Sequence, residues 1–319
     1  MRKDIQMKQA ILITSYKDFE QLIKLINQFD ETFNIYVHID KKSDVTFWDF
    51  NSQADVDFVQ ELTKIKNVKY VGQDYSIKWG GMSHLKAYLR LSEIALKDKE
   101  NSFFHLITGQ DYPIKNNDYF ASIAKNTKCN YLEHFKMPRT NGKWNGGGMD
   151  RLEYYNFYDF FNALSKRGFV WINRFIRLQK RINFKRPIND YLGQLYGGST
   201  YWSLSREVLQ YVIDFRKSNK KHFRRFKYTF AAEEIYFPTV IMNSPYSNKV
   251  VNDNLRFIDW ESGKGGYPAF LDETDFQDII NSNKLFARKI DKSETRLTQM
   301  ITAHRNNNHD IGKLKGTPH

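Results

Sequence analysis

The amino-acid sequence predicts an α/β fold in which a parallel sheet is covered by helices on both faces. Short apolar runs alternate with amphipathic stretches through the first half of the chain, and the same rhythm returns near residue 200. This alternation is typical of parallel strands joined by crossover helices. The chain has 319 residues, of which 41% are hydrophobic, so it is long enough to bury a large core.

The predicted elements follow one another in a regular order. Strands are expected at short runs that are mostly apolar at 10–14, 35–39 and 103–107, and also at 68–71, 130–134 and 200–204. Helices are expected where apolar residues recur at helical spacing, at 18–29, 82–96, 169–184, 205–215 and 232–242. Ligands of such sheets bind beyond the C-terminal ends of the strands. Those ends are residues 14–15, Asp40 and residues 108–111.

The regular pattern is interrupted between about residues 141 and 190, which hold a glycine-rich stretch, an aromatic run and a basic helical segment. The chain has no internal repeat, long linker or low-complexity block. We therefore predict one domain over residues 1–304, with a first part at 1–135, an insertion at 136–195 and a second part at 196–304. Residues 305–319 are expected to form a polar tail.

Lys and Arg outnumber Asp and Glu by 49 to 36, which gives a net charge of +13. Nucleic acid, an anionic membrane surface or phosphate-bearing substrates would suit this charge. Segment 169–184 fits a helix lying on an anionic membrane, or a surface helix packed on its own core. Its apolar residues and its arginines fall on different sides: Phe169, Ile172, Phe175, Ile176 and Ile182 against Arg174, Arg177 and Arg181. Segment 220–227 (KKHFRRFK) interleaves aromatic and basic residues, as single-strand nucleic-acid binders do. We expect a solvated loop here in preference to a nucleic-acid site.

The single cysteine, Cys129, excludes an intrachain disulfide. The apolar run at 10–13 is too short for a signal peptide, and no stretch approaches the apolar length that a membrane-spanning helix needs. We therefore expect a cytoplasmic protein, with peripheral attachment to the inner membrane as an option.

The acidic residues offer little for a metal ion. The strand at 103–107 leads into Gly109-Gln110-Asp111, where only one carboxylate is available to bind a divalent cation. The pair Asp55 and Asp57 follows a polar stretch and is expected in an exposed loop or at a helix start. Because no Cys/His cluster has zinc spacing, we expect no metal and no cofactor. Basic side chains would then balance a leaving diphosphate, and the candidates are Arg256, Lys264, Arg288 and Lys289.

Two adjacent carboxylates, Glu233 and Glu234, begin the helix predicted at 232–242. Neighbouring helical residues diverge by roughly a quarter turn or more, so one can face a cleft while the other faces solvent. Favourable interaction with the helix dipole is the alternative explanation. The sequence lacks a P-loop, a G-x-G-x-x-G helix start and a G-x-S-x-G elbow, which disfavours a P-loop kinase, a dinucleotide enzyme and an α/β-hydrolase.

Eight sequence words, in order along most of the chain, resemble the core-2/I-branching glycosyltransferases, which form glycosyltransferase family 14. This family includes β-1,6-N-acetylglucosaminyltransferases and peptide O-xylosyltransferases. The words are IYVHIDKKSD (35–44), IKWGGMSHLKA (77–87), FFHLITGQDYPIK (103–115), NYLEHFKMP (130–138), GGSTYWSLSRE (197–207), AAEEIYFPTVI (231–241), LRFIDW (255–260) and NKLFARKID (283–291).

The resemblance implies a GT-A-type fold with a Rossmann-like nucleotide-binding half, the use of UDP-sugars, inversion at the anomeric carbon and no metal. Residues 1–135 would then bind the nucleotide-sugar, 136–195 would form the acceptor region and 196–304 the catalytic half. It makes Glu234 the catalytic base. On the donor side it implies Lys289 at the diphosphate, Asp40 beside the nucleoside and Trp79, to which the strand ends add Ser15 and Asp111. On the acceptor side it implies Glu133 and Trp260.

The chain departs from the animal enzymes of this family in three ways. They carry a second diphosphate-binding Arg before the final helix, where this chain offers Lys264, with Arg256 as a further helper. An aromatic residue that follows the acceptor Trp in those enzymes is replaced by Ser262. We also expect this chain to lack their membrane anchor and, with a single cysteine, their disulfides, which points to a bacterial relative.

From this resemblance we expect transfer of N-acetylglucosamine from a UDP-sugar to a glycan, in the synthesis of a surface polysaccharide or lipopolysaccharide. The positive net charge and the helix predicted at 169–184 lead us to expect an acceptor linked to a lipid carrier or lipid A core at the inner membrane face. UDP-xylose, UDP-galactose and UDP-glucose are the alternative donors. A non-catalytic glycan- or nucleic-acid-binding protein is the alternative of a different class, although nucleic acid is not the expected partner.

Overall fold

The computed structural model describes residues 7–49, 54–125, 129–140, 142 and 144–307. Its main sheet has seven strands in the order β10-β8-β9-β6-β1-β2-β5. These strands are β1 (Lys8–Ser15), β2 (Phe33–Ile39), β5 (Val68–Gly72), β6 (Asn101–Thr108), β8 (Asn130–Lys136), β9 (Tyr196–Ser205) and β10 (Val250–Val251). The predicted α/β class is therefore confirmed.

The sheet is not entirely parallel, as the sequence had suggested. Strands β6, β1, β2 and β5 pair in parallel, whereas β9 lies antiparallel between β6 and β8. The insertion before β9 lets the chain re-enter the sheet from the opposite end. Two smaller sheets complete the strands: β3 (Thr46–Asp49) with β4 (Ala54–Asp57), and β7 (Asp111–Pro113) with β11 (Arg256–Ile258) and β12 (Phe286–Arg288).

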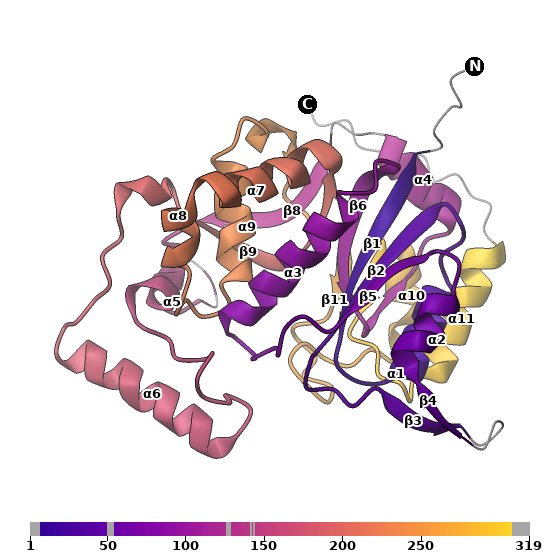
Figure 1. Cartoon of the computed structure of the whole chain (residues 1–319), viewed down its shortest axis with the longest axis horizontal. Coiled ribbons are helices and arrows are strands. Elements are labelled where there is room, and N and C mark those ends of the chain that lie inside the picture. Colours follow the sequence, from indigo (N-terminus) through magenta and orange to yellow (C-terminus); the bar gives the residue numbers. More distant parts are fainter. Residues whose placement is uncertain (1–6, 50–53, 126–128, 141, 143, 308–319) are drawn as a thin grey trace.

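Helices cover both faces of the main sheet (Figure 1). Alternate residues of β1 enter different cores: Ala10 and Leu12 pack in one cluster, Ile11 and Ile13 in the other. The first cluster includes α3 (Met82–Ala95), α7 (Arg206–Ser218) and α9 (Glu233–Met242); the second includes α1 (Phe19–Ile26), α2 (Phe58–Lys64) and α4 (Asn117–Lys125). A third core packs the small β7-β11-β12 sheet against α10 (Phe276–Asn281) and α11 (Thr295–Asn307).

The insertion holds the short helix α5 (Asp150–Glu153) and the longer α6 (Lys166–Arg181), which lies away from the body (Figure 1). The predicted apolar side of α6 is not a buried face: Ile172 is buried, whereas Phe169 and Ile182 are more than half exposed. Segment 220–227 is not a solvated loop. It forms α8 (Lys220–Arg225), and Phe226 after it is fully buried.

Two further local expectations can be compared with the structure. Asp57 begins α2 as its N-cap and accepts a hydrogen bond from the backbone of Val59, as a helix start requires. The predicted tail starts too early, because α11 continues to Asn307 and Arg305 is buried with hydrogen bonds to Gln28 and to the carbonyl of Lys115. Residues 308–319 lie outside the described residues.

Candidate active site

The C-terminal ends of β1, β2 and β6 meet at one edge of the sheet. Their register pairs Ser15 with Ile39 and Thr14 with Thr108, so Ser15, Asp40 and Thr108 lie close to that edge. Gly109 permits this approach, since a Cβ atom there would stand 2.9 Å from the Ser15 hydroxyl. The sequence-predicted strand ends are therefore brought together.

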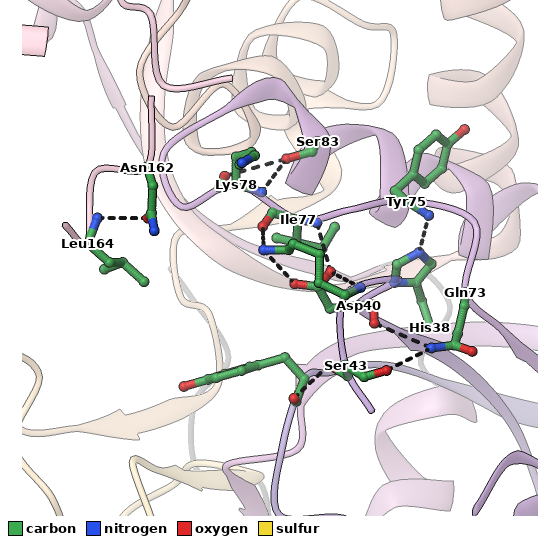
Figure 2. Close-up of polar contacts among 12 residues, drawn as sticks. His38, Asp40, Ser43, Gln73, Tyr75, Ile77, Lys78, Ser83, Asn162 and Leu164 are labelled. Atoms are coloured by element: carbon green, nitrogen blue, oxygen red, sulfur yellow. Dashed lines mark hydrogen bonds and ion pairs between the residues drawn. The ribbon is translucent and has the colours of Figure 1, made fainter. Parts of the chain in front are cut away.

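Asp40 organises the loop that follows β5 (Figure 2). Its Oδ1 accepts hydrogen bonds from the backbone N–H groups of Lys42 (3.0 Å) and Ile77 (3.1 Å), and Lys42 Nζ lies 3.2 Å from Oδ2. His38 Nε2 accepts from the N–H of Tyr75 at 3.1 Å. Burial lowers the pKa of His38, which favours the neutral ring that such an acceptor needs. Asp40 and His38 thus hold residues 75–77 against the sheet edge.

This loop leads to Trp79, which is 51% exposed beside the rings of Tyr158 and Phe230. Gly80 adopts φ of 74°, and a Cβ there would meet the Phe230 ring at 2.6 Å. Its carbonyl accepts a hydrogen bond from the N–H of Ala231 at 2.9 Å, just before α9. The loop beside Asp40 is therefore bonded to the start of the helix that carries Glu234.

Asp111 is 1% exposed and is engaged within the protein. Its Oδ2 accepts hydrogen bonds from the backbone N–H and the hydroxyl of Thr108, and Arg288 Nη1 lies 3.2 Å away. The guanidinium of Arg288 also donates to the Thr108 hydroxyl and lies over the ring of Tyr201. Asp111 therefore orients a buried cation rather than projecting toward solvent.

Lys289 follows Arg288 and forms no salt bridge with any residue of the described chain. Its ammonium lies 4.3 Å from the centre of the Phe270 ring. Partial burial lowers the pKa of Lys289, and the positive charges of Arg288 and Lys17 lower it further. Arg288 and Lys17 are paired with Asp111 and Asp18, whereas Lys289 has no carboxylate partner among the described residues, which favours the binding of an anion beside Lys289.

Two other predicted diphosphate ligands are placed less favourably. Arg256 is 3% exposed, and burial lowers its pKa to about 10. Its guanidinium donates to one hydroxyl and three main-chain carbonyls, those of Ser203, Asn254, Leu106 and Trp202. This position favours a role in joining strands over direct contact with a ligand.

Lys264 lies on the loop after β11 and is held by acidic partners. Its Nζ is 3.1 Å from Asp275 and 3.5 Å from Asp272, and it donates to the hydroxyl of Thr274 at 2.9 Å. Hydrogen bonding to Asp275 raises the pKa of Lys264. Binding a diphosphate would require Lys264 to leave both carboxylates.

Glu234 stands in the first turn of α9 with its side chain 27% exposed. Its Oε2 accepts a hydrogen bond from Arg151 Nη1 at 2.5 Å, whereas Oε1 has only a long contact of 3.5 Å with the Thr200 hydroxyl. Burial raises the pKa of Glu234, and the positive charge of Arg151 opposes that rise. The charge of Glu133 raises the same pKa, so these two predicted site residues lie within electrostatic reach of each other.

The adjacent Glu233 does not face solvent. It is 4% exposed, and its Oε1 lies 3.5 Å from Nδ1 of His84 on α3. The expectation that one carboxylate of this pair faces solvent is therefore wrong, because α9 is packed into the core on most of its surface.

Glu133 projects from an irregularity in β8. The pairing of β8 with β9 shifts register between Leu132 and His134, and Gly198 on β9 lies so close that a Cβ would meet the Glu133 carbonyl at 1.9 Å. The Glu133 side chain is exposed and accepts a hydrogen bond from Asn254 at 2.8 Å. Gly198 therefore permits the close approach of β9 to β8.

Trp260 is 44% exposed on the loop after β11. The centres of the Trp260 and Tyr267 rings are 4.9 Å apart, and the ring planes are tilted by 60°. An aromatic partner is thus present beside Trp260, although it comes from a later position than Ser262.

Two residues that sequence reasoning missed complete the arrangement. Arg151 on α5 lies 3.4 Å from the centre of the Trp144 ring and 4.9 Å from that of Phe230, so aromatic rings on two segments hold its guanidinium toward Glu234. Tyr201 is buried under Arg288, and burial raises its pKa, with further effects from Arg288, Asp111 and Glu234. Tyr201 therefore contacts the basic cluster directly and is influenced by the charge of Glu234. Only the glycine-rich stretch before Arg151 marked its neighbourhood in the sequence.

Among the described residues, no three His, Cys, Asp or Glu side chains come together as a metal site. Likewise, none of the described helices combines the length and apolar character needed to cross a bilayer.

The model of the Core-2/I-Branching enzyme family matches residues 10–280. Xylosyltransferase 1 of Mus musculus is 26% identical over 258 residues, covering 79% of this chain and 23% of that protein. Xylosyltransferase 2 of Rattus norvegicus is 27% identical over 255 residues, covering 78% of this chain and 26% of that protein. The chain thus spans about a quarter of the length of these curated relatives. The apo structure of the WbbM bifunctional glycosyltransferase aligns with a TM-score of 0.33 at 11% identity, covering 79% of this chain and 39% of that one, which is too distant to support an argument.

Proposed function

Because the chain belongs to the Core-2/I-Branching enzyme family, we propose that it is a metal-independent, inverting glycosyltransferase that uses a UDP-sugar and a glycan acceptor. The proposal rests mainly on the different contacts of the two carboxylate oxygens of Glu234. One of its oxygens is held by Arg151 and the other has only a long contact with Thr200. A carboxylate fixed through one oxygen can accept a proton through the other.

The donor would bind over the sheet edge formed by Ser15 and Asp40, with the diphosphate at Lys289. Lys289 supports this orientation because it has no carboxylate partner among the described residues and stands beside two other cations, Arg288 and Lys17. Bound phosphate oxygens would neutralise that cluster. Trp79 would lie at the side of the donor nearest α9, since Gly80 is bonded to Ala231 there.

In the proposed reaction, an acceptor hydroxyl oxygen attacks the anomeric carbon while the bond from that carbon to the UDP oxygen breaks on the opposite face. The hydroxyl proton passes to Oε1 of Glu234, and Lys289 stabilises the negative charge on the departing UDP. Glu133 and Trp260 would bind the acceptor, and the electrostatic influence of Glu133 on Glu234 supports their common site. Attack from the face opposite the leaving group inverts the configuration.

The hydrogen bonds and ion pair of Asp111 support a reaction that does not need a metal ion. This lone carboxylate at the sheet edge is bonded to Thr108 and Arg288, so a cation already stands beside it within the protein. Lys289 can then supply charge to the diphosphate from the adjacent position. We propose N-acetylglucosamine as the transferred sugar and a surface polysaccharide or lipopolysaccharide as the product. Xylose is the second candidate, because the matched relatives are named xylosyltransferases.

The proposal is tested by measuring UDP release from a panel of UDP-sugars with EDTA present throughout. Release from one donor would identify the sugar, and Glu234→Gln should reduce it by about a hundredfold or more without loss of UDP binding. Glu233→Gln is the matched control, because it removes the neighbouring carboxylate and should retain most of the turnover. Activity that appears only with added manganese would overturn metal independence. Full turnover by Glu234→Gln would overturn the assignment of the base.

A further inference from the structure

The insertion exposes an unusual number of large apolar side chains. Helix α6 lies apart from the sheet and its covering helices (Figure 1). Leu164 is 78% exposed, Ile182 62%, Leu178 53% and Trp171 47%. Others in the same segment are also exposed: Phe160, Phe169, Val170 and Phe184. A soluble surface rarely concentrates so much apolar area unless it meets a partner or a membrane.

Part of this apolar surface forms a stripe along α6 and its C-cap. Trp171, Leu178 and Ile182 are separated by seven and four residues, so they lie on one side of the helix. The buried residues Gly168, Ile172 and Gln179 fall on the adjacent side, which faces the body. The stripe therefore flanks the buried face of α6 and stays exposed.

The same segment is strongly basic. Residues 160–189 contain eight Lys and Arg and no Asp or Glu. Lys180 and Lys185 are paired with Asp150 and Glu153 of α5, and Arg186 is buried. The five remaining cations form no salt bridge with the described residues: Lys166, Arg167, Arg174, Arg177 and Arg181. Arg167, Arg174 and Arg181 recur every seven residues and so follow the apolar stripe along its edge.

We propose that α6 and its flanking residues dock on an anionic lipid bilayer. The apolar stripe would enter the boundary between headgroups and acyl chains, and the arginines beside it would contact lipid phosphates. The aliphatic members favour lipid over single-stranded nucleic acid, because Leu164, Leu178 and Ile182 have no aromatic face on which bases could stack. Charge complementarity selects an anionic bilayer over an apolar protein groove.

Short contacts connect this surface to the active site. On α5, Asp150 pairs with Lys180 of α6, Arg151 pairs with Glu234, and Glu153 pairs with Lys185 after α6. Docking would therefore bring the acceptor side close to the bilayer, as a lipid-anchored acceptor requires. That consequence rests on the proposed function, whereas the docking itself does not.

The first test is co-sedimentation of the full chain with phosphatidylcholine vesicles, with and without phosphatidylglycerol. Binding should require the anionic lipid and weaken as salt increases. Replacing Arg167, Arg174 and Arg181 with Gln should weaken it by about tenfold or more. The matched control replaces three exposed cations at the other end of the molecule with Gln, namely Lys24, Lys66 and Arg296. This control should bind like the wild type.

The second test is quenching of Trp171 fluorescence by lipids brominated on their acyl chains. Quenching should fall markedly in Trp171→Phe, which keeps an apolar side chain and hence binding, while Leu178→Ser with Ile182→Ser should reduce binding itself. UDP release in solution should be unchanged in the arginine variant, so a failure to dock is distinguishable from a failure of the enzyme assignment.

Several outcomes would overturn the proposal. Equal binding to both kinds of vesicle, or no binding, would remove its basis. Oligonucleotide binding that competes with vesicles and depends on the three arginines would make this a nucleic-acid surface. A stable dimer that dissociates on changing Leu178 and Ile182 to Ser would assign the stripe to a second copy of the chain.

Discussion

The two sides of the proposed site are built in different ways. On the donor side, Asp111 and Arg256 are almost fully buried, and Arg288 is bonded to Asp111 in the same buried cluster. On the acceptor side, Trp260 and Glu133 project from a loop and a strand irregularity with large exposed areas. Glu234, the proposed base, is half-buried and held by its ion pair to Arg151.

This difference indicates how substitutions should separate stability from activity. A buried charged group that is removed leaves its partners without hydrogen bonds in a medium where water cannot replace them. An exposed side chain that is removed is replaced by solvent. Substitutions in the buried donor-side cluster should therefore lower the free energy of unfolding. Substitutions on the acceptor side should change substrate binding and leave stability unchanged.

The largest effect is expected for Arg256→Met. The carbonyls of Leu106 and Trp202 would lose their donor within the core, at a cost of about 3 kcal/mol or more in the free energy of unfolding. Urea denaturation measures this change. Lys264→Met is the control, because its exposed ion pairs should contribute less than about 1 kcal/mol. If Arg256→Met lowered the free energy of unfolding by less than about 1 kcal/mol, the hydrogen bonds of Arg256 would not stabilise the fold as inferred.

Lys289→Met should weaken UDP binding by about tenfold to a hundredfold, since it removes a charged donor to phosphate. Calorimetry with UDP and with uridine distinguishes the phosphate contact from other effects, because uridine affinity should not change. The unfolding midpoint should also stay near that of the wild type, as Lys289 forms no salt bridge with the described residues. An equal loss for uridine would contradict the placement of the diphosphate.

Arg151→Gln should shift the pH dependence of turnover. A base must be ionised, so activity rises as pH increases through the pKa of Glu234. The positive charge of Arg151 lowers that pKa against the raising effect of burial. Removing the charge should therefore move the acidic limb of the kcat profile to higher pH, while Arg151→Lys should keep it near the wild-type position. An unchanged limb in Arg151→Gln would show that another group governs the profile.

The smallest effect is expected for Trp260→Ser, which should raise the KM for the acceptor by about fivefold. The KM for the UDP-sugar and the urea midpoint should not change, because Trp260 is 44% exposed and its ring packs beside the exposed Tyr267. Tyr267→Ser is the companion variant, expected to act in the same direction. A loss of stability in either would place the aromatic pair with the buried donor side.

Most of the main sheet could be predicted from the sequence. The apolar runs that became β1, β2 and β6 are buried on both faces, as near-continuous apolar runs in parallel strands are expected to be. The antiparallel β9 could not be predicted, because strand direction depends on where the insertion returns the chain. Helix α8 was missed because its six residues are mostly basic, although His222 and Arg225 within it and Phe226 after it are buried.

The sequence by itself determined the α/β class, the strands whose ends form the site edge, and the family, since these depend on local pattern and on words that persist in order. Only the tertiary structure decided which charged residues are free to act. Arg256, Arg288 and Lys289 are all basic residues near strand ends, yet one joins strands, one balances Asp111 and one is left without a carboxylate partner among the described residues. Likewise, Arg151 reaches Glu234 across 83 residues of sequence. Pairing and burial arise from contacts between distant segments, and no local pattern encodes them.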